Sequence, residues 1–544
     1  MQPVLNVEDV RKVEQDLTLE GVSLAELMRR AGHAVAQEVL DLGNRGPVVV
    51  LCGTGNNGGD GWVAAELMAK AGAQVEVMTP VEPEALKSPL ALMVAQSAVN
   101  AGVPFFVAPT RDELDAHLAQ AAVVVDALLG TGFHGEPAAP FDIWIDAVNG
   151  SGAHVVAVDV PSGLSAQTGH APGQAVFADT TVTMICLKPG LLSGRGRDVC
   201  GAIVLAPLAE QAERLVIEAD PVAWRCDTAD YFETLTEPTA DVDKYSRGSV
   251  LVVGGSIRFP GAAVMAAKAA ARSGAGYVTL VVPDRIATVC RTHLLEIPVV
   301  GLPTNGEGMF SAEARTEIAK MAEQHSCVLC GSGMGVCADT VSVVSSLLEC
   351  DVPLVLDADA LNALARMTTN RLDNFPELIR REAPLVLTPH RRELGRLVGQ
   401  PKEPPASLTA ALEAARRIVW ADGGSDICVV AKGEATGCVG VEVALLPKPG
   451  PACLATAGSG DVLGGIMAAL LARGVADNGI LPLLCAFACE LHGFAANLAA
   501  EARGSRGVMA SDLIDNLGLA LDAMEEQVSL AAAGMTPSDD EGSE

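Results

Sequence analysis

Positive charge and aromatic side chains are both scarce in this sequence. The 544 residues include 37 Lys and Arg against 67 Asp and Glu, a formal net charge of −30, and Phe, Trp and Tyr make up 3% of the chain. A surface this acidic repels phosphate backbones and anionic lipid headgroups, so we expect no nucleic-acid or membrane partner. A single anionic nucleotide is still compatible, because helix N-termini and backbone N–H groups supply local positive potential.

Regularly spaced cysteines and long apolar runs are also lacking. The 14 cysteines follow no disulfide-framework spacing. The one CxxC, Cys327 and Cys330, has no second pair to complete a zinc site, so we expect buried strand cysteines. The first forty residues lack the apolar stretch of a secretory signal, and the most apolar segment, Leu481–Ala500, is interrupted by Glu490 and His492 and is expected to be a buried helix. These features predict a cytoplasmic protein.

Glycine and aliphatic residues are abundant by contrast. The chain has 55 Gly and is 49% hydrophobic, which favours α/β sheets with glycine-rich turns. Its length predicts more than one domain. The strand–turn–helix rhythm is lost over residues 210–247, where we place the junction. We therefore expect domains over 1–222 and 241–533, a connector over 223–240 and a disordered acidic tail over 534–544.

Strand and helix patterns alternate in both halves. The first half has expected strands over 48–52, 74–78, 122–126, 154–159 and 181–187, with helices over 61–71 and 88–101. Ser23 and Glu26 form a capping-box pair that opens an earlier helix through Leu40. The second half has expected strands over 249–255, 277–283, 328–331, 354–357, 385–388 and 427–431, with alanine-rich helices over 261–273 and 459–473. Such alternation requires crossover connections and predicts a mostly parallel sheet in each half.

A glycine-rich run follows the first strand of the first half. Gly53–Gly61 contains five glycines, the paired Asn56 and Asn57, and Asp60. Such a run could cradle a phosphate, because glycines let the backbone approach an anion and a helix N-terminus favours its charge. A tight strand–helix turn with capping Asn and Asp is the less favoured alternative.

Two further strands of this half end in polar clusters. Asp126 begins Asp-Ala-Leu-Leu-Gly-Thr-Gly, and Asp159 begins Asp-Val-Pro-Ser-Gly. Because ligands bind at the carboxyl ends of parallel strands, these clusters are expected to meet in one crevice. Asn57, Asp126 and Ser162 offer oxygen donors that could hold a hard cation, which leaves Asp159 free for proton transfer. Singly, each Asp is more often a turn former or helix cap.

The strongest motif of the second half is Ala457-Gly-Ser-Gly-Asp461, which leads into an apolar helix. Its glycine turn presents N–H groups to phosphate, and Asp461 can take a proton from a hydroxyl that attacks phosphorus. Taken alone, an N-cap aspartate fits equally well. The companion strand ends favour a site; they are Lys432–Thr436, Gly331–Gly335, Asp357–Asn362 and Thr388–His390. His390 could instead be a capped turn histidine.

Four motifs of the first half occur in the order typical of the NAD(P)H-hydrate epimerase family, which this half resembles from residue 1 to about 217. They are Gly55–Gly61, Asp126–Gly132, Asp159–Gly163 and Thr183–Gly190, after Leu27-Met28 and Ala31-Gly32. The resemblance implies a Rossmann-like three-layer αβα domain that interconverts the R and S hydrates of NADH and NADPH. It implies K⁺ at Asn57, Asp126 and Ser162, and Asp159 as the catalytic acid or base, with Lys188 a weaker candidate. The implied hydrate contacts are Asn56, Asn57, Gly58, Gly59, Asp60, Gly130, Thr131, Gly132, Phe133, His134, Gly135, Glu136 and Asp159.

The second half, over about 241–530, resembles the NAD(P)H-hydrate dehydratase family. Lys244-Tyr245, Gly248, Gly255-Ser256 and Pro260-Gly-Ala262 add to the motifs above. The resemblance implies a ribokinase-like α/β domain that dehydrates the S epimer and converts ADP to AMP and phosphate, with Asp461 as the catalytic base. It places Ala262, Gly335, His390 and Asp461 at the hydrate, and Lys432, Gly433, Glu434, Ala435, Thr436 and Gly460 at the nucleotide. Family members often have Pro-Gly between the His and the Glu, whereas Arg391-Arg392 precede Glu393 here; the departure concerns the shape of this loop.

Two competing interpretations stay open on the sequence alone. The Gly-Ser-Gly-Asp turn is shared with small-molecule kinases, so the second half could be a vitamin-precursor kinase, and the first half could be a non-catalytic binding module. The fusion of the two halves and the intact Asp159, Asn57 and Asp126 count against both. We expect a bifunctional repair enzyme acting on NADH and NADPH hydrates with ADP as co-substrate, and a homo-oligomer. Mg²⁺ is expected because it offsets the charge of nucleotide phosphates.

Overall fold

The fold is given by a computed structural model. The structure describes residues 1–43, 46–234, 247–368, 381–421, 426–474 and 480–532. The chain divides into two compact units, Gln2–Val222 and Ala223–Glu544 together with Met1. The expected acidic tail and the Lys244-Tyr245 pair lie outside the described residues.

One parallel sheet forms the centre of the N-terminal unit. The strands of this unit are β1 (Gln2–Val4), β2 (Val48–Cys52), β3 (Val75–Thr79), β4 (Phe105–Val107), β5 (Val123–Ala127), β6 (His154–Val158), β7 (Thr180–Met184) and β8 (Ala202–Ala206). Its helices are α1 (Val7–Leu19), α2 (Leu24–Asp41), α3 (Asn56–Lys70), η1 (Pro83–Ala85), α4 (Pro89–Asn100), α5 (Arg111–Leu118), α6 (Phe141–Gly150), α7 (Pro189–Leu192), α8 (Gly196–Val199) and α9 (Ala212–Glu218). The sheet runs β4-β3-β2-β5-β6-β7-β8, and all its neighbouring strands are parallel. The order reverses between β2 and β5, the switch point at which doubly wound sheets bind ligands.

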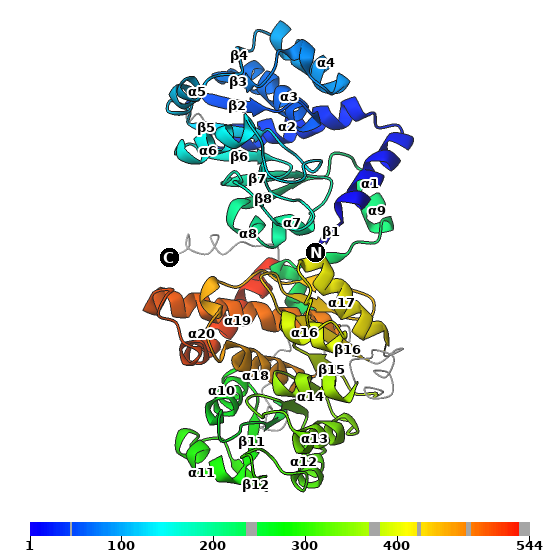
Figure 1. Ribbon diagram of the computed structural model, residues 1–544, viewed down its shortest axis with the longest axis vertical. Helices are drawn as coiled ribbons and strands as arrows, with labels where there is room; N and C mark the ends of the chain where they lie inside the picture. Colours follow the sequence, from blue (N-terminus) through cyan, green and yellow to red (C-terminus); the bar gives the residue numbers. More distant parts are fainter. Residues whose placement is uncertain (44–45, 235–246, 369–380, 422–425, 475–479, 533–544) are drawn as a thin grey trace. The chain divides into compact units, whose positions relative to one another are not determined.

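Strand β2 shows why helices cover both faces of this sheet. Its five residues are all buried, the continuous apolar pattern typical of parallel strands. Val48, Val50 and Cys52 share a core with apolar residues of α1, α2, α3 and α4, whereas Val49 and Leu51 share another with residues of α5 and α6. Figure 1 shows α2, α3 and α4 on one side of the sheet and α5 and α6 on the other. The predicted three-layer arrangement is therefore present.

A longer, mixed sheet organises the C-terminal unit. Its strands are β9 (Ala223–Arg225), β10 (Ser249–Val253), β11 (Tyr277–Pro283), β12 (Val299–Leu302), β13 (Cys327–Cys330), β14 (Leu354–Leu356), β15 (Leu385–Leu387), β16 (Ile427–Ala431), β17 (Gly437–Val439) and β18 (Ala444–Leu446). Its helices are η2 (Thr228–Thr234), α10 (Pro260–Arg272), α11 (Asp284–His293), α12 (Ala314–Ala322), α13 (Ala338–Leu348), α14 (Asp359–Met367), α16 (Arg391–Leu397), α17 (Leu408–Ala421), η4 (Ala452–Leu454), α18 (Ser459–Ala472), α19 (Leu481–Arg503) and α20 (Ala510–Ala532). The order is β9-β18-β17-β16-β15-β14-β13-β10-β11-β12. Strands β10 to β16 are parallel, whereas β17 runs antiparallel to both of its neighbours. The order reverses between β10 and β13, which makes this pair the switch point.

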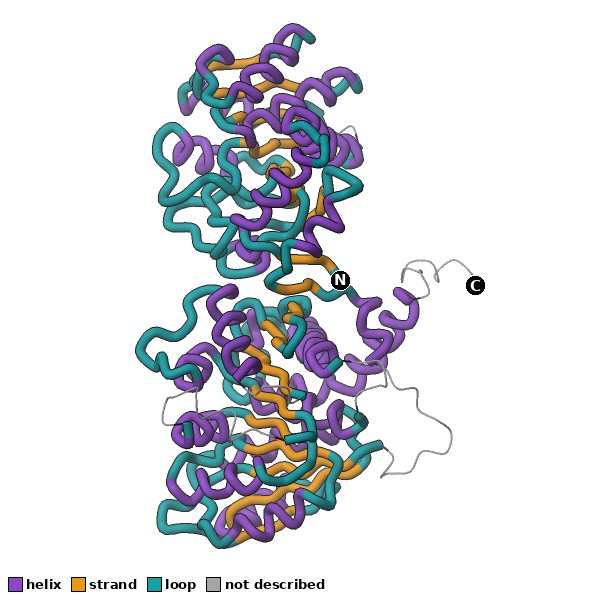
Figure 2. Tube along the Cα trace, turned by 90° about the vertical axis from the view of Figure 1, so that its right-hand side faces the viewer, coloured by secondary structure: helices purple, strands orange, loops and turns teal. Residues whose placement is uncertain are grey.

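Four helices cover one face of the second sheet. Apolar residues of α10, α18, α19 and α20 share a core with Val250 and Val252 of β10. Figure 1 shows α12, α13 and α14 on the opposite side of the strands, and Figure 2 shows helices flanking the strands within each unit. Among the described residues, α19 is the one helix long and apolar enough to cross a membrane, but 72% of its apolar window is buried inside the protein. It is a core helix, as predicted for Leu481–Ala500.

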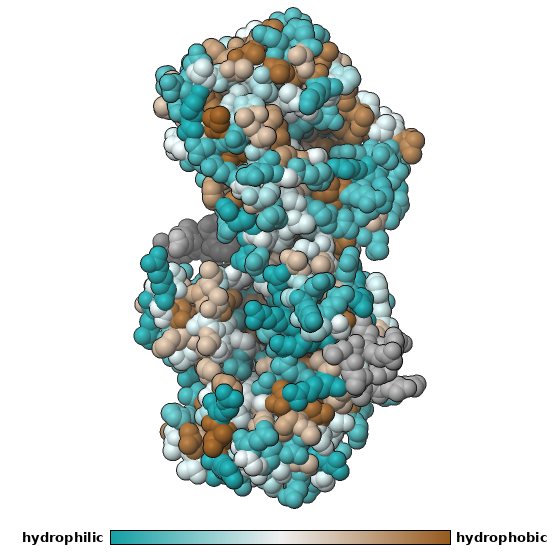
Figure 3. Space-filling model, in the orientation of Figure 1, coloured by the Kyte–Doolittle hydropathy of each residue, from teal (hydrophilic) through white to brown (hydrophobic). Residues whose placement is uncertain are grey.

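The predicted α/β class is confirmed in both halves. The strands expected over 48–52, 277–283 and 427–431 have the predicted bounds, and the other expected strands are found with ends shifted by a few residues. Residues 223–234, expected to lie in a connector, form β9 and η2 within the second unit, where the buried Tyr231 hydroxyl donates to Glu490 Oε1 at 2.7 Å. All 14 cysteines are free, and Cys327 and Cys330 are fully buried, as expected. The face of the protein seen in Figure 3 is mainly hydrophilic, with hydrophobic residues in small separate patches.

Candidate active sites

The glycine-rich run after β2 is shorter than the sequence indicated, because α3 begins at Asn56 rather than Gly61. A Cβ on Gly58 would lie 2.0 Å from the Gly53 carbonyl oxygen, and one on Gly61 would lie 2.6 Å from Ala127 Cβ. These glycines therefore allow α3 to pack directly against the ends of β2 and β5. Asn56, Asn57 and Asp60 consequently lie in the first turns of a helix at the switch point, and not in an open loop.

Asp126 and Ser162 are joined at the ends of β5 and β6. The Ser162 hydroxyl donates to Asp126 Oδ1 at 2.6 Å, and the Ser162 N–H donates to Oδ2 at 2.8 Å. Both side chains are fully buried. Burial raises the pKa of Asp126 to about 6, although the bonds from Ser162 act in the opposite direction. The carboxylate thus lies in a setting that a cation would stabilise.

Asn57 lies at the same switch point. A Cβ on Gly130, which follows β5, would be 3.0 Å from Asn57 Oδ1. The Asn57 Nδ2 atom is buried and has no hydrogen-bond partner among the described residues. A buried polar atom without a partner is costly. This side chain therefore has unused hydrogen-bonding capacity beside the strand ends that carry Asp126 and Ser162.

Asp159 and Lys188 form an ion pair after β6 and β7. The Lys188 Nζ atom is 2.5 Å from Asp159 Oδ1 and also donates to Thr183 Oγ1 at 2.9 Å and the Met184 carbonyl at 2.8 Å. Its side chain is 1% exposed, and that of Asp159 is 13% exposed. Asp159 has φ +65°, a left-handed conformation that is uncommon for a non-glycine residue. Strain of this kind is found at functional sites, where the surrounding structure holds it in place.

Two further carboxyl groups face Asp159. Burial raises the pKa of Asp60 well above its usual value, and the charges of Asp159 and Glu14 add to the effect. Burial also raises the pKa of Glu14 on α1, again with Asp159 as the next contribution. The sequence identified Asp60 but gave no signal for Glu14, a half-buried residue of an amphipathic helix. The site therefore combines a lysine-bound carboxylate with two carboxyl groups that resist ionisation.

The loop after β5 carries the rest of the predicted hydrate contacts. From Thr131 to Glu136 its residues are half-buried or exposed. Arg11 of α1 donates to the Thr131 carbonyl oxygen at 3.4 Å. The loop and α1 thus approach each other beside the switch point.

In the C-terminal unit, the loops after β10 and β13 are bound to each other at the switch point. The Gly255 N–H donates to the Ser332 carbonyl at 2.7 Å, and the Ser256 hydroxyl donates to the Gly333 carbonyl at 2.7 Å. A Cβ on Gly333 would be 2.9 Å from Ala262 Cβ on α10. The Gly335 N–H donates to Asp359 Oδ2 at 2.8 Å. The predicted hydrate residues Ala262 and Gly335 therefore lie on adjoining segments.

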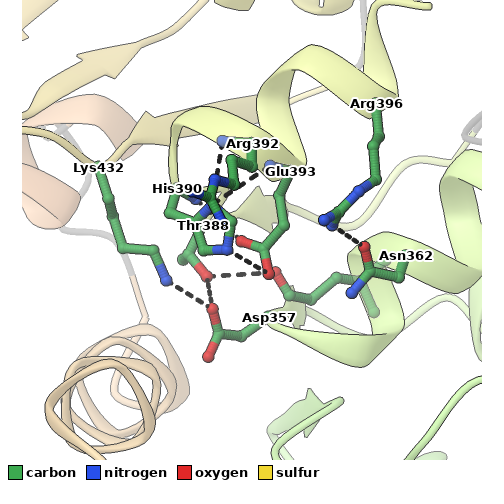
Figure 4. Close-up of polar contacts among 9 residues, drawn as sticks. Asp357, Asn362, Thr388, His390, Arg392, Glu393, Arg396 and Lys432 are labelled. Carbon is green, nitrogen blue, oxygen red and sulfur yellow. Dashed lines mark hydrogen bonds and ion pairs between the residues drawn. The ribbon is translucent and has the colours of Figure 1, made fainter. Parts of the chain in front are cut away.

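Lys432 and Asp357 form the polar centre of this site (Figure 4). Lys432 Nζ donates to Asp357 Oδ1 at 2.8 Å, and the Thr388 hydroxyl donates to the same oxygen at 2.6 Å. Asp357 is buried. Burial favours a lower pKa for Lys432, but Asp357 and Glu393 together hold that pKa above its usual value. The ammonium group is thus kept charged at the ends of β14, β15 and β16.

The His390 ring caps the N-terminus of α16, which was the alternative interpretation of this residue. Its Nδ1 atom accepts from the N–H groups of Arg392 at 3.1 Å and Glu393 at 3.3 Å, and Glu393 Oε2 accepts from the His390 N–H at 2.9 Å. The His390 side chain is half-exposed, and Figure 4 shows it beside Thr388 and Glu393. Burial raises the pKa of Glu393 to about 7. Arg391 and Arg392 therefore begin a helix whose cap still places His390 beside Lys432, to whose backbone it is bridged.

Asp461 lies in the first turn of α18. The helix follows Gly458, whose φ is +90°, and it has no side-chain cap. Within the described residues, the N–H groups of Gly460 and Asp461 donate no hydrogen bond. Burial, followed by the charge of Asp357, raises the pKa of Asp461 to about 6. The nearby Ser332 hydroxyl lowers the pKa of Asp461, although its distance and angles do not meet those of a hydrogen bond.

The turn before Asp461 and the Lys432 ammonium approach each other. A Cβ on Gly460 would be 3.6 Å from Lys432 Nζ. Two open N–H groups at a helix N-terminus beside an ammonium group form a favourable setting for phosphate. The structure therefore brings together the predicted Lys432, Gly460 and Asp461. Asp357 and Glu393, which were not among the predicted site residues, belong to the same group of charges; Asp357 heads a strand-end motif that the sequence did single out.

Comparisons with known proteins give matches in both halves. The family model for the YjeF-related protein N-terminus matches residues 24–190, and the model for NAD(P)H-hydrate dehydratase matches residues 250–518. The bifunctional NAD(P)H-hydrate repair enzyme Nnr of Salinibacter ruber is 36% identical over 536 residues, covering 94% of this chain and 95% of that protein. Its counterpart in Hyperthermus butylicus is 35% identical over 478 residues, covering 86% and 83%. The ADP/ATP-dependent NAD(P)H-hydrate dehydratase of Bacillus subtilis, co-crystallised with ATP and Mg²⁺, is 25% identical and covers 54% of this chain and 97% of that one, with a TM-score of 0.43.

Proposed function

This chain belongs to the family of bifunctional NAD(P)H-hydrate repair enzymes, and on that premise we propose how its own residues perform the two reactions. It is an NAD(P)H-hydrate epimerase and an ADP/ATP-dependent NAD(P)H-hydrate dehydratase. The observation that carries the proposal is that each unit has a carboxylate near a lysine that follows a strand of its sheet: Asp159 is paired with the buried Lys188, and Asp461 lies in the group of charges that contains Lys432. Each carboxylate is the acid–base group of its own half.

The epimerase half inverts the hydroxyl-bearing carbon of the hydrated ring. Loss of the hydroxyl is assisted by the ring nitrogen, and the departing oxygen takes a proton from Asp60, whose protonated form is favoured by burial. Water then adds to the opposite face and gives its proton to Asp159. Lys188 holds the Asp159 carboxylate in place through the 2.5 Å contact. Two carboxyl groups with different protonation states are what acid–base chemistry on two faces requires.

Asn57, Asp126 and Ser162 fit a K⁺ ion, which remains part of the proposal. The donor set is three oxygens, the ligand type that hard cations prefer. A bound cation would stabilise the ionised form of Asp126, whose pKa is raised by burial. Such an ion would supply positive charge near the pyrophosphate-bearing hydrate. Its binding would also keep Asp126 ionised.

The dehydratase half converts the hydroxyl of the S epimer into a better leaving group. Asp461 takes the proton of that hydroxyl as its oxygen attacks the terminal phosphorus of ADP, and AMP leaves. Phosphate is then eliminated from the phosphorylated hydrate, which restores the dihydronicotinamide. The open N–H groups of Gly460 and Asp461 and the nearby ammonium of Lys432 would stabilise the transferred phosphate. Lys432–Thr436 holds the nucleotide, and Ala262, Gly335 and His390 hold the hydrate.

Mg²⁺ would be bound chiefly by the nucleotide phosphates and would offset their charge. The described residues contain no group of three His, Cys, Asp or Glu side chains that could hold a metal ion. This fits Mg²⁺, which usually keeps its waters and takes one or two carboxylates together with substrate phosphates. Asp461 and the neighbouring Asp359, whose charge helps to raise the pKa of Asp461, are the carboxylates that could take part. We propose ADP, and not ATP, as the preferred nucleotide.

One assay tests the function. A mixture of R and S NADH hydrates is incubated with the protein and either ADP or ATP, and the near-ultraviolet absorbance of reduced nicotinamide is followed. Full recovery of NADH with ADP is expected; no recovery of NADH with either nucleotide would instead favour the vitamin-precursor kinase. The homo-oligomer and the cytoplasmic location also remain part of the proposal, and the 14 free cysteines support a reducing compartment.

A further inference from the structure

Ser459 is the first residue of α18, yet its side chain is turned away from solvent. It is 6% exposed and makes no capping bond to its own helix. Its hydroxyl instead lies 3.2 Å from Nε2 of His492. The N-cap residue before it is Gly458, which has no side chain to satisfy a free N–H of the first turn. The N–H groups of Gly460 and Asp461 in this turn therefore stay open.

His492 lies in the middle of the apolar core helix α19 and is 5% exposed. Burial, with a further contribution from the charge of Lys432, lowers the pKa of His492 to about 4. The imidazole is therefore neutral near neutral pH. A buried neutral histidine needs hydrogen-bond partners, and the Ser459 hydroxyl is one of them. The bond thus ties the catalytic turn of α18 to a rigid part of the core.

The same turn is fixed from a second side. A Cβ on Gly458 would lie 2.6 Å from Met265 Cε and 3.0 Å from Ala510 Cβ, so α10 and the start of α20 also limit its position. These contacts restrict the backbone before Ser459, whereas His492 restricts the residue that directly precedes the open N–H groups. Orientation matters here, because misplacing a catalytic group by about 1 Å can cost on the order of 100-fold in rate.

We infer that His492 is a positioning residue for the dehydratase reaction: through the Ser459 hydroxyl it orients the open N–H groups of Gly460 and Asp461 toward the transferred phosphate. The inference rests on the proposed role of this turn at phosphate. This positioning is expected to stabilise the transition state, in which charge on the phosphate oxygens is redistributed, more than it strengthens nucleotide binding.

The test uses Ser459→Ala, His492→Ala, the double variant and Ser459→Thr in the full-length protein. Each single loss is expected to lower kcat for ADP-dependent dehydration about tenfold with little change in KM for ADP, the size of one hydrogen bond's contribution. The double variant is expected to be no slower than the worse single variant, because both remove the same bond. Ser459→Thr keeps the hydroxyl and is expected to retain most of the activity.

His325→Ala is the matched control, because its Nε2 atom also contacts a hydroxyl, Thr279 Oγ1 at 3.0 Å, in the same unit. It is expected to leave dehydration unchanged, and epimerisation serves as an internal control in every variant. The inference is overturned if the two single losses multiply in the double variant, if Ser459→Thr is as slow as Ser459→Ala, or if only KM changes. Should His492→Ala not fold, the Ser459→Ala and Ser459→Thr pair decides alone. Absence of dehydration in the unsubstituted protein would contradict the proposed function itself.

Discussion

The ammonium nitrogen of Lys188 lies 2.5 Å from a carboxylate oxygen of Asp159, and it also donates to oxygens of Thr183 and Met184 at the end of β7. The lysine is almost fully buried, so it does not reach bulk water to satisfy its charge. The pair therefore fixes both side chains. This relationship gives Lys188 a defined structural setting that its Lys-Pro-Gly sequence context did not reveal.

Replacing Lys188 with Met should lower kcat for epimerisation about 100-fold, the equivalent of roughly 3 kcal/mol for a charge-assisted hydrogen bond. Asp159 would lose the contact that orients it. Dehydration of the pure S epimer should be unchanged in the same protein. Lys12→Met, which removes an exposed lysine of α1, is the matched control. Near-normal epimerisation by Lys188→Met would exclude the positioning role.

Binding of K⁺ should depend on the ionisation of Asp126. The pKa of this buried carboxyl is about 6, above its value of about 3.9 in an unfolded chain, so ionising it without a cation costs folding stability as pH rises from about 4 to 6. K⁺ should therefore raise the melting temperature of the N-terminal unit more at pH 7.5 than at pH 5. Calorimetry with K⁺ or choline chloride measures this. Asp126→Asn should remove both the K⁺ effect and its pH dependence; an equal response to both salts would refute the site.

The pH dependence of the dehydratase rate should show a fall at acid pH that is caused by protonation of Asp461. Burial raises the pKa of this base to about 6, so it is protonated and inactive below that pH and ionised above it. The rate, kcat/KM, should fall about tenfold for each pH unit below this value. Asp461→Asn should lower the rate by orders of magnitude while ADP binding, followed by calorimetry, stays largely intact. A flat profile between pH 5 and 7 would show that another group is the base.

Variants of Lys432 and Asp357 should show separately how this ion pair affects protein stability and nucleotide affinity. Lys432→Met leaves the buried Asp357 carboxylate unpaired, which should cost roughly 3–5 kcal/mol of stability as well as nucleotide affinity. Adding Asp357→Asn removes the orphaned charge, so the double variant should regain most of the stability but none of the affinity. Denaturant unfolding and ADP titration measure the two effects. Recovery of both together would mean that Lys432 has no direct contact with the nucleotide.

Much of the fold could be predicted from the sequence, because buried parallel strands have continuous apolar runs and end in polar residues. The bounds of β11 and β16 show this. Short strands such as β17 and β18, three residues each, carry too little pattern to be identified. The start of α3 was misplaced because glycine is disfavoured in helices on average, whereas Gly58 and Gly61 are required here by close contact with the sheet.

The site was harder to predict where residues act through tertiary contacts. Asp126, Asp159, Lys432 and Asp461 could be found because each lies at the end of a strand, directly after one, or after a glycine turn. Glu14 and His492 could not, since both lie within helices and reach their sites only through packing. His390 was identified as a site residue, but its capping bonds depend on the helix that Arg391 and Arg392 begin.

The central claim is that Asp159 and Asp461 serve two separate reactions, and progress curves on an equal mixture of R and S NADH hydrates with ADP test it most directly. The unsubstituted protein should restore all of the NADH. Asp159→Ala should restore the S half rapidly and the rest only at the rate of spontaneous inversion, whereas Asp461→Asn should restore none and still interconvert the epimers. If Asp159→Ala also lost dehydration of the S half, or if it consumed the R hydrate at the normal rate, the account would be contradicted.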